Sequence, residues 1–152
     1  MSVLFQFPAI MDEKATARKV MIFFKEDVQN LRDICKQSEN QFISSPSFDG
    51  ISYKQENVNS TENAIVNSID AKRELKIINA TIDECSPEYA QLLKFAYIYQ
   101  LNPVKASMKM AMSTRTYQRH LTKARIEFAI KYAAKNRNLI EYRKEDVHDE
   151  TH

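Results

Sequence analysis

A single glycine, Gly50, among 152 residues is the feature that most limits what this chain can fold into. Glycine supplies the positive φ angles of tight two-residue hairpins, and it lets backbone approach phosphate in the loops of P-loop and dinucleotide-binding enzymes. Enzymes of those two classes are therefore excluded. No stretch of the sequence alternates apolar and polar residues with the period of two that a half-buried strand requires. Together these two patterns predict an all-α fold.

The length fits one domain, or one small domain with an added arm. A hydrophobic content of 43% and a mean hydropathy of −0.50 allow one helical core, and no run is long enough to span a membrane. The apolar opening Met1–Ile10 has no basic start and leads into Asp12, so it does not resemble a signal peptide. We expect a cytoplasmic protein without a membrane partner.

The net charge of +2 is a cancellation between segments of opposite sign. Residues 103–137 contain nine basic side chains and one acidic one, a net charge of +8. Residues 1–102 hold 11 basic and 14 acidic side chains, and residues 138–152 hold two and five. A local positive potential of this size attracts polyanions, of which nucleic acid is the usual one in the cytoplasm. A solvated basic helix face is the alternative that charge alone leaves open.

Apolar spacing predicts a long helix over residues 12–38, with Val20, Phe24, Val28, Leu31 and Cys35 on one face. Residues 39–61 are rich in Ser, Asn and Gln, which favours a linker. A second helix is expected from an N-cap at Thr61 to about Glu84. The predicted organisation is an arm over 1–40, a linker over 41–60, a binding domain over 61–137 and an acidic tail over 138–152.

Cap and proline signals divide the rest of that domain into three helices. Ser86-Pro87 opens a helix that ends near Gln100, and Asn102-Pro103 opens a short helix through Lys109 or Met110. Ser113 caps the last helix, residues 114–134. Its apolar face is expected to contain Tyr117, Leu121, Ala124, Phe128 and Tyr132.

A short helix, a tight turn and a capped second helix have the dimensions of a helix-turn-helix, whose second helix enters the major groove of DNA. With the apolar face turned inward, the polar face at the helix start is expected to contact bases. These base-contacting residues are Thr114, Arg115, Gln118, Arg119 and Thr122. Phosphate contacts are expected from Lys105, Lys109, Ser113, Lys123 and Arg125. A helical hairpin with a solvated lysine-rich face is the alternative interpretation.

The segment from Ser86 to Tyr132 resembles the fourth region of bacterial sigma factors, and Ser113–Ala124 resembles the recognition helix of that region. More specifically, the chain resembles the autolysin-regulator (ArpU-like) family of phage and prophage transcriptional regulators, from about Phe7 to Tyr132. The matching pieces are Phe7-Pro8, 12–16 with Val20, 45–50, 62–65, 113–117, Ala124 and Phe128-Ala129. The resemblance implies a regulator of phage late genes that binds promoter DNA. Ala111 departs from the glycine that sigma-like turns usually place there, a position that often needs a positive φ.

No set of nucleophile, base and orienting group can be assembled from the sequence, so we expect no enzyme activity and no cofactor. We also expect no metal site, since Cys35 and Cys85 lack ligand spacing and His148 and His152 lie in the acidic tail. The expected partners are double-stranded promoter DNA and RNA polymerase. The long N-terminal helix either packs on the binding domain or pairs two chains. The rival hypothesis is a helical adaptor that acts on RNA polymerase without touching DNA.

Overall fold

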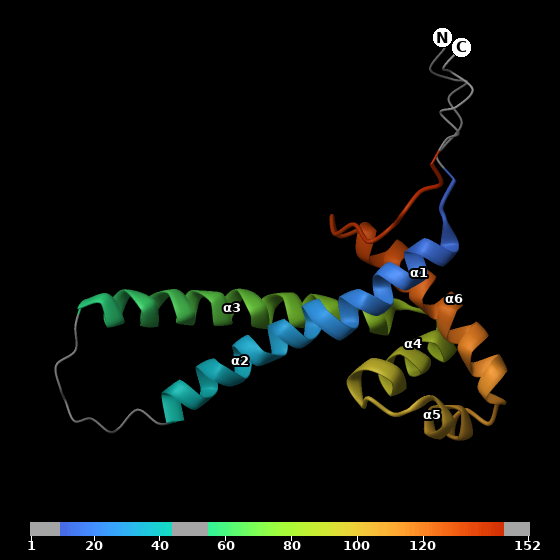
Figure 1. Ribbon diagram of the computed structural model, residues 1–152, viewed down its shortest axis with the longest axis horizontal. Coiled ribbons are helices and arrows are strands. Elements are labelled where there is room, and N and C mark those ends of the chain that lie inside the picture. The colour runs from blue at the N-terminus through green and yellow to red at the C-terminus, as the bar shows by residue number, and fades with distance from the viewer. Residues whose placement is uncertain (1–9, 44–54, 145–152) are drawn as a thin grey trace, which may run out of the picture. The chain divides into compact units, whose positions relative to one another are not determined.

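The computed structural model describes residues 10–43 and 55–144, and every regular element in those ranges is a helix (Figure 1). The elements in chain order are α1 (Glu13–Ile22), the π-helical turn η2 (Phe23–Asp27), α2 (Val28–Ile43), α3 (Gln55–Glu84), α4 (Pro87–Leu93), the π-helical turn η3 (Lys94–Ile98), α5 (Pro103–Lys109) and α6 (Thr114–Ala133). A lone antiparallel bridge joins Met11 to Tyr142. The all-α prediction is confirmed. Within the described ranges, no helix has both the length and the apolar character needed to cross a membrane.

The chain divides into two compact units, and the division differs from the expected arm, linker and domain. The first unit joins the residues up to Ile22 to those from Ile82 onward, and the second spans Phe23–Thr81. The predicted arm is therefore split where α1 passes into η2. Helices α2 and α3 also run into the predicted linker, and the expected cap at Thr61 is wrong because α3 begins at Gln55. The remaining linker residues, 44–54, lie outside the described residues.

The first unit is built around α6, against which α1, α4 and α5 all pack (Figure 1). Each residue of the predicted apolar face is at most 4% exposed: Tyr117, Leu121, Ala124, Phe128 and Tyr132. The rings of Phe128 and Tyr132 stack with their centroids 5.1 Å apart. Burying an aromatic or leucine side chain of this kind stabilises a fold by roughly 1.5–3 kcal/mol, so α6 is the main support of this unit.

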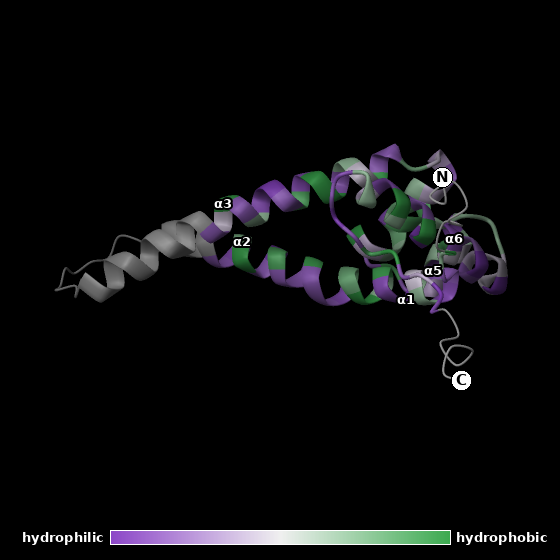
Figure 2. Cartoon of the chain, turned by 90° about the horizontal axis from the view of Figure 1, so that it is seen from above, coloured by the Kyte–Doolittle hydropathy of each residue, from purple (hydrophilic) through white to green (hydrophobic). Residues whose placement is uncertain are grey.

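The second unit contains η2, α2 and most of α3. The predicted apolar face of the N-terminal helix is buried at Phe24 and Val28, and α3 buries Ala71 and Ile78. Apolar residues recur along both helices in Figure 2. Thr81 is fully buried, and its hydroxyl donates to the Ile77 carbonyl at 2.7 Å, which satisfies a polar group away from water.

The π-helical turn η3 changes which aromatic side chains face the core. Ordinary helical spacing places Tyr99 on the packed stripe, yet Tyr99 is 60% exposed while Tyr97 is only 7% exposed. The amide of Tyr99 donates to the Lys94 carbonyl at 2.8 Å, a bond over five residues instead of four. The wider turn inserts one residue and rotates the following side chains, so the expected register fails here.

The segment after α6 is pinned to α1 as far as it is described. The Asp12 amide donates to the Glu141 carbonyl at 2.8 Å, and the Arg143 amide donates to the Ile10 carbonyl at 2.8 Å. The Thr16 hydroxyl accepts from the Glu141 amide at 3.0 Å. Leu139 is 9% exposed. The first residues of the predicted acidic tail over 138–152 therefore pack on α1, and residues 145–152, with His148 and His152, lie outside the described part.

The turn between α5 and α6 keeps left-handed backbone although it has no glycine. Ala111 has a φ of 55°. The Met112 amide donates to the Ser107 carbonyl at 3.0 Å and the Ala111 amide to the Met108 carbonyl at 3.1 Å. This pair of bonds is the Schellman arrangement, which normally ends on glycine. Alanine thus stands where sigma-like turns usually have glycine, and the left-handed geometry of the turn is kept.

Replacing Ala111 with glycine should stabilise the protein. Left-handed backbone costs an L-residue about 1–2 kcal/mol, and glycine loses about 0.5–1 kcal/mol of that gain through its freer unfolded chain. We expect Ala111→Gly to raise the free energy of unfolding by about 0.5–1 kcal/mol in urea titrations followed by circular dichroism. The matched control is Ala134→Gly, since Ala134 has a helical φ of −64°. That control should have a lower free energy of unfolding than the parent. An unchanged or lower free energy of unfolding for Ala111→Gly would show that Ala111 is not strained.

Candidate nucleic-acid interface

Helices α5 and α6 form the predicted pair, and side-chain caps define where each begins. The Asn102 side chain accepts from the Lys105 amide at 2.8 Å, and the Ser113 hydroxyl accepts from the Thr116 amide at 3.1 Å. Both caps predicted from the sequence are confirmed. Ser86 occupies the third predicted cap position, but its side chain does not cap α4. A short helix, a Schellman turn and a capped helix follow one another in the order that a helix-turn-helix requires.

The polar face of α6 is open to solvent at its N-terminal half. Four of the five expected base-contacting residues are exposed: Thr114, Arg115, Gln118 and Arg119. The fifth, Thr122, is half-buried, and its hydroxyl donates to the Gln118 carbonyl at 3.0 Å. A threonine hydroxyl that bonds its own helix in this way is a poorer base reader. Thr114, Arg115, Gln118 and Arg119 are therefore the expected residues that lie open to solvent at the start of α6.

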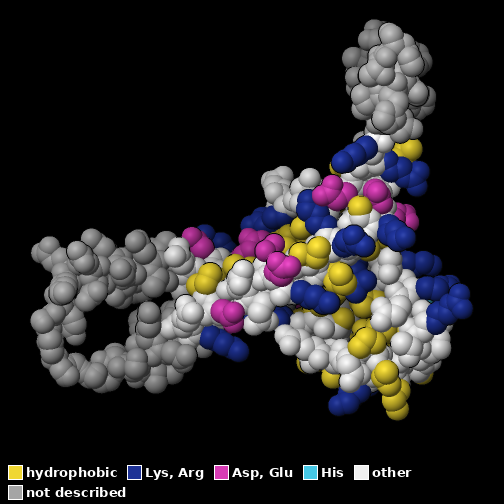
Figure 3. Space-filling view, in the orientation of Figure 1, with side chains coloured by type: hydrophobic (Ala, Val, Ile, Leu, Met, Phe, Trp, Pro, Cys, Tyr) yellow, Lys and Arg dark blue, Asp and Glu magenta, His cyan; other side chains and the backbone are white. Residues whose placement is uncertain are grey.

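Among the expected phosphate contacts, the three lysines Lys105, Lys109 and Lys123 are exposed. Ser113 is exposed too, but its hydroxyl is engaged in the cap and also lies 3.0 Å from the Thr116 hydroxyl. The side chains of α6 visible in Figure 3 include several Lys and Arg groups along its outer side. The lysines remain available as point charges for a polyanion.

Arg125 has a structural contact that sequence reasoning missed. Its Nε donates to the Tyr97 hydroxyl at 2.7 Å, and its guanidinium carbon lies 5.9 Å from the centre of the Tyr97 ring. Burial raises the pKa of Tyr97 above its ordinary value, although Arg125 opposes that shift, so the hydroxyl stays protonated. The contact holds η3 to α6, because a guanidinium stacks well on an aromatic face. The structure thus gives Arg125 a contact between η3 and α6, whereas its expected contact with phosphate stays a prediction.

Ion pairs in the first unit separate the available cations from the engaged ones. Three cations are paired with acids: Lys94 with Asp83 at 2.9 Å, Lys135 with Glu84 at 2.8 Å and Lys19 with Glu141 at 2.8 Å. Within residues 10–37 and 67–144, no acidic partner within 4.0 Å is found for Lys105, Lys109, Arg115, Arg119 or Lys123. These five cations, all predicted to meet nucleic acid, therefore have no acidic counter-charge in the described part of the chain.

His120 and Glu88 connect the start of α4 to α6. The His120 Nδ1 lies 3.1 Å from a Glu88 carboxylate oxygen, with the two side chains 28% and 49% exposed. Because a carboxylate only accepts, the ring nitrogen donates when this bond forms. His120 is therefore directed at α4 and not at the outer face that holds Arg119.

Glu127, the lone acid of the basic segment, fastens the chain before α4 to α6. Its two carboxylate oxygens accept from the Ser86 amide at 2.6 Å and from the Ser86 hydroxyl at 2.9 Å. Burial, with Glu127 nearby, raises the pKa of the Cys85 thiol to about 12. Cys85 is therefore held as a protonated, buried thiol, whereas Cys35 is only half-buried.

Two exposed apolar side chains on α5 were not expected. Val104 is 58% exposed and Met108 is 73% exposed. They lie four residues apart on the helix, next to Lys105 and Lys109. Spacing alone could not show this, because Ala106 and Ser107 are the residues that α5 buries.

Comparisons with protein families, with curated proteins and with solved structures give no match to this chain. Within the described residues, no group of three or more His, Cys, Asp or Glu side chains is placed to hold a metal ion.

Glu127→Gln should loosen the attachment of α4 to α6. The amide keeps the shape of the carboxylate and can still pair its oxygen with the Ser86 amide and its NH2 group with the Ser86 hydroxyl, but the charge is lost. Hydrogen bonds to charged groups are worth about 1.5–3 kcal/mol and neutral ones about 0.5–1.5 kcal/mol, so we expect a loss of about 1–2 kcal/mol in the free energy of unfolding. Ser86→Ala removes the bond from the hydroxyl and leaves the bond from the backbone amide. Equal stability of Glu127→Gln and the parent would show that this carboxylate does not fasten the helices.

Proposed function

We propose that this chain is a sequence-specific, DNA-binding regulator of transcription that acts at phage late promoters, with α6 in the major groove. The role needs no catalytic step, metal or cofactor. Its proposed partners are double-stranded promoter DNA, RNA polymerase and, through the helix predicted over 12–38, a second copy of the chain. It would act in the host cytoplasm, on the nucleoid. The resemblance to the ArpU-like family is the support for the late-gene assignment.

The observation that carries the proposal is the exposed face at the start of α6. Arg115, Gln118 and Arg119 are exposed side by side on one capped helix, and the two arginines have no acidic partner among the described residues. Arginine can bond guanine through two hydrogen bonds and glutamine can do so with adenine. Lys105, Lys109 and Lys123 are exposed and lie close to these residues in sequence. Their charges suit contacts with the phosphate backbone.

Charge also divides between the two units in the way that a DNA-binding unit requires. The described residues of the first unit hold 15 basic and seven acidic side chains, a net charge of +8, whereas those of the second hold six and eight, a net charge of −2. Positive potential that is concentrated on the unit with the helix-turn-helix favours its approach to a polyanion.

A helical adaptor for RNA polymerase is the second candidate, and the exposed pair Val104 and Met108 favours it. Exposed apolar side chains beside lysines suit a protein surface with acidic and apolar groups. The adaptor hypothesis forbids salt-dependent binding of the isolated chain to DNA alone. A binding titration with naked duplex therefore separates the two candidates.

Arg119→Ala should relax sequence preference. Duplexes selected from a random pool by the parent chain would provide a preferred sequence, and a scrambled duplex of equal length the reference. Loss of a two-bond contact to a base costs about 1–3 kcal/mol, so the ratio of the two dissociation constants should fall by about 5- to 150-fold. An unchanged ratio would show that Arg119 does not read bases.

Lys123→Ala should weaken binding to the selected and to the scrambled duplex by the same factor. It should also reduce the slope of log affinity against log salt by about 1, because a phosphate contact releases one counterion. Lys72→Ala, on α3, is the control with the same loss of charge. Equal changes in slope and preference for Arg119→Ala and Lys123→Ala would contradict the division between base and phosphate contacts.

A further inference from the structure

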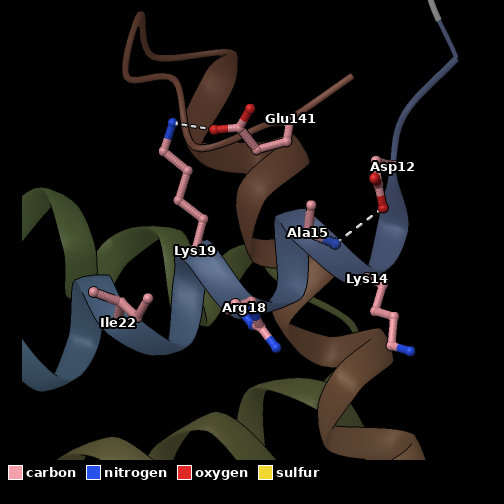
Figure 4. Close-up of a pocket in the computed structure, with 7 residues that line it drawn as sticks. All are labelled: Asp12, Lys14, Ala15, Arg18, Lys19, Ile22 and Glu141. Carbon is pink, nitrogen blue, oxygen red and sulfur yellow. Dashed lines mark hydrogen bonds and ion pairs between the residues drawn. The ribbon is translucent and has the colours of Figure 1, made fainter. Parts of the chain in front are cut away.

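A hollow on the outer surface of α1 lies within the first unit and has no part in the site described above. It encloses about 610 Å³, and its lining includes Asp12, Lys14, Arg18, Lys19, Ile22 and Glu141 (Figure 4). Lys14 and Arg18 are four residues apart on α1, and both are exposed. Residues at this spacing share one face of a helix, so the two cations form a short basic row along α1.

The acids around the hollow are already engaged, which leaves the basic row unbalanced. An Asp12 carboxylate oxygen accepts from the Ala15 amide at 3.0 Å and so caps α1. A Glu141 carboxylate oxygen accepts from Lys19 Nζ at 2.8 Å. Figure 4 shows both bonds, with Lys14 and Arg18 directed away from Glu141. In the described part of the chain, neither Lys14 nor Arg18 has an acid within 4.0 Å. An anion is the ligand that this surface favours.

Helix α1 is held firmly beside α6, so its basic row has a defined place next to the proposed DNA-binding helix. The two helices pack together. The Thr16 hydroxyl accepts from the Glu141 amide, and the Asp12 amide donates to the Glu141 carbonyl. These two bonds fasten α1 to the segment that follows α6. In Figure 3, Lys and Arg side chains lie over α1 as well as along α6.

A helix packed on the flank of a groove-bound helix comes close to the DNA backbone. Packed helices lie about 8–10 Å apart, and the major groove is about 12 Å wide. Such a neighbour is therefore within reach of the sugar–phosphate backbone that borders the groove. A lysine and an arginine without sequence preference are the side chains expected there.

We propose that α1 binds the sugar–phosphate backbone of the duplex whose groove α6 enters, with Lys14 and Arg18 as the phosphate contacts. This inference rests on the proposed function and adds to it a second contact surface, made by the N-terminal helix. That surface widens the footprint of the protein beyond the helix-turn-helix. It also gives α1, which packs on α6, a role on DNA.

The test is the salt dependence of DNA binding by the double variant Lys14→Gln/Arg18→Gln of the full chain. Two lost phosphate contacts should reduce the slope of log affinity against log sodium chloride by about 1.8, at 0.9 per contact. Affinity for the selected duplex and for the scrambled duplex should fall by the same factor, because contacts to the sugar–phosphate backbone hold no sequence information. The exchange variant Lys14→Arg/Arg18→Lys keeps both charges and should restore the parent slope.

The matched control is Lys72→Gln/Lys76→Gln, which removes two exposed cations at the same spacing on α3. Circular dichroism and thermal unfolding of each variant establish that the helices are retained. A Lys14→Gln/Arg18→Gln slope equal to that of the control would overturn the inference while leaving the proposed function intact. So would an unchanged slope with loss of binding to RNA polymerase, which would make the row a protein contact. Failure of the parent chain to bind any duplex would overturn the proposed function itself.

Discussion

The first unit depends on the burial of one face of α6. Tyr117, Leu121 and Phe128 must leave water, and α1, α4 and α5 supply the surfaces that cover them. With that face fixed, the opposite face has to stay in solvent, and its first turns contain Arg115, Gln118 and Arg119. The proposed base-reading surface is therefore the reverse side of the core. No separate device is needed to present it.

Internal ion pairs and hydrogen bonds decide which cations remain available. Glu84, Asp83 and Glu141 each neutralise a lysine, and Glu127 is engaged with Ser86. Partly exposed pairs of this kind add little stability, commonly under about 1 kcal/mol each. Their larger effect is on the distribution of charge. Among the described residues, the cations of α5, of the outer face of α6 and of α1 where DNA contacts are proposed have no acidic partner.

Local signals predicted the helical elements well, because helix caps and apolar spacing act over a few residues. The caps at Asn102 and Ser113 and the buried face of α6 followed directly from sequence. The exposed position of Tyr99 did not, because the π-helical turn η3 has no clear sequence signature. Nor did the left-handed Ala111, where the bonds of the turn outweigh the preference for glycine.

The sequence by itself determined the all-α class, the helix-turn-helix spacing and the segregated positive charge, since each depends on residues close together in the chain. Only the tertiary structure decided that α1 belongs with the C-terminal helices, that residues 139–143 pack on it, and that Arg125 is engaged with Tyr97. These contacts join residues 28 to 133 positions apart. Periodicity cannot report them, because it shows which side of a helix is apolar without showing which partner covers that side.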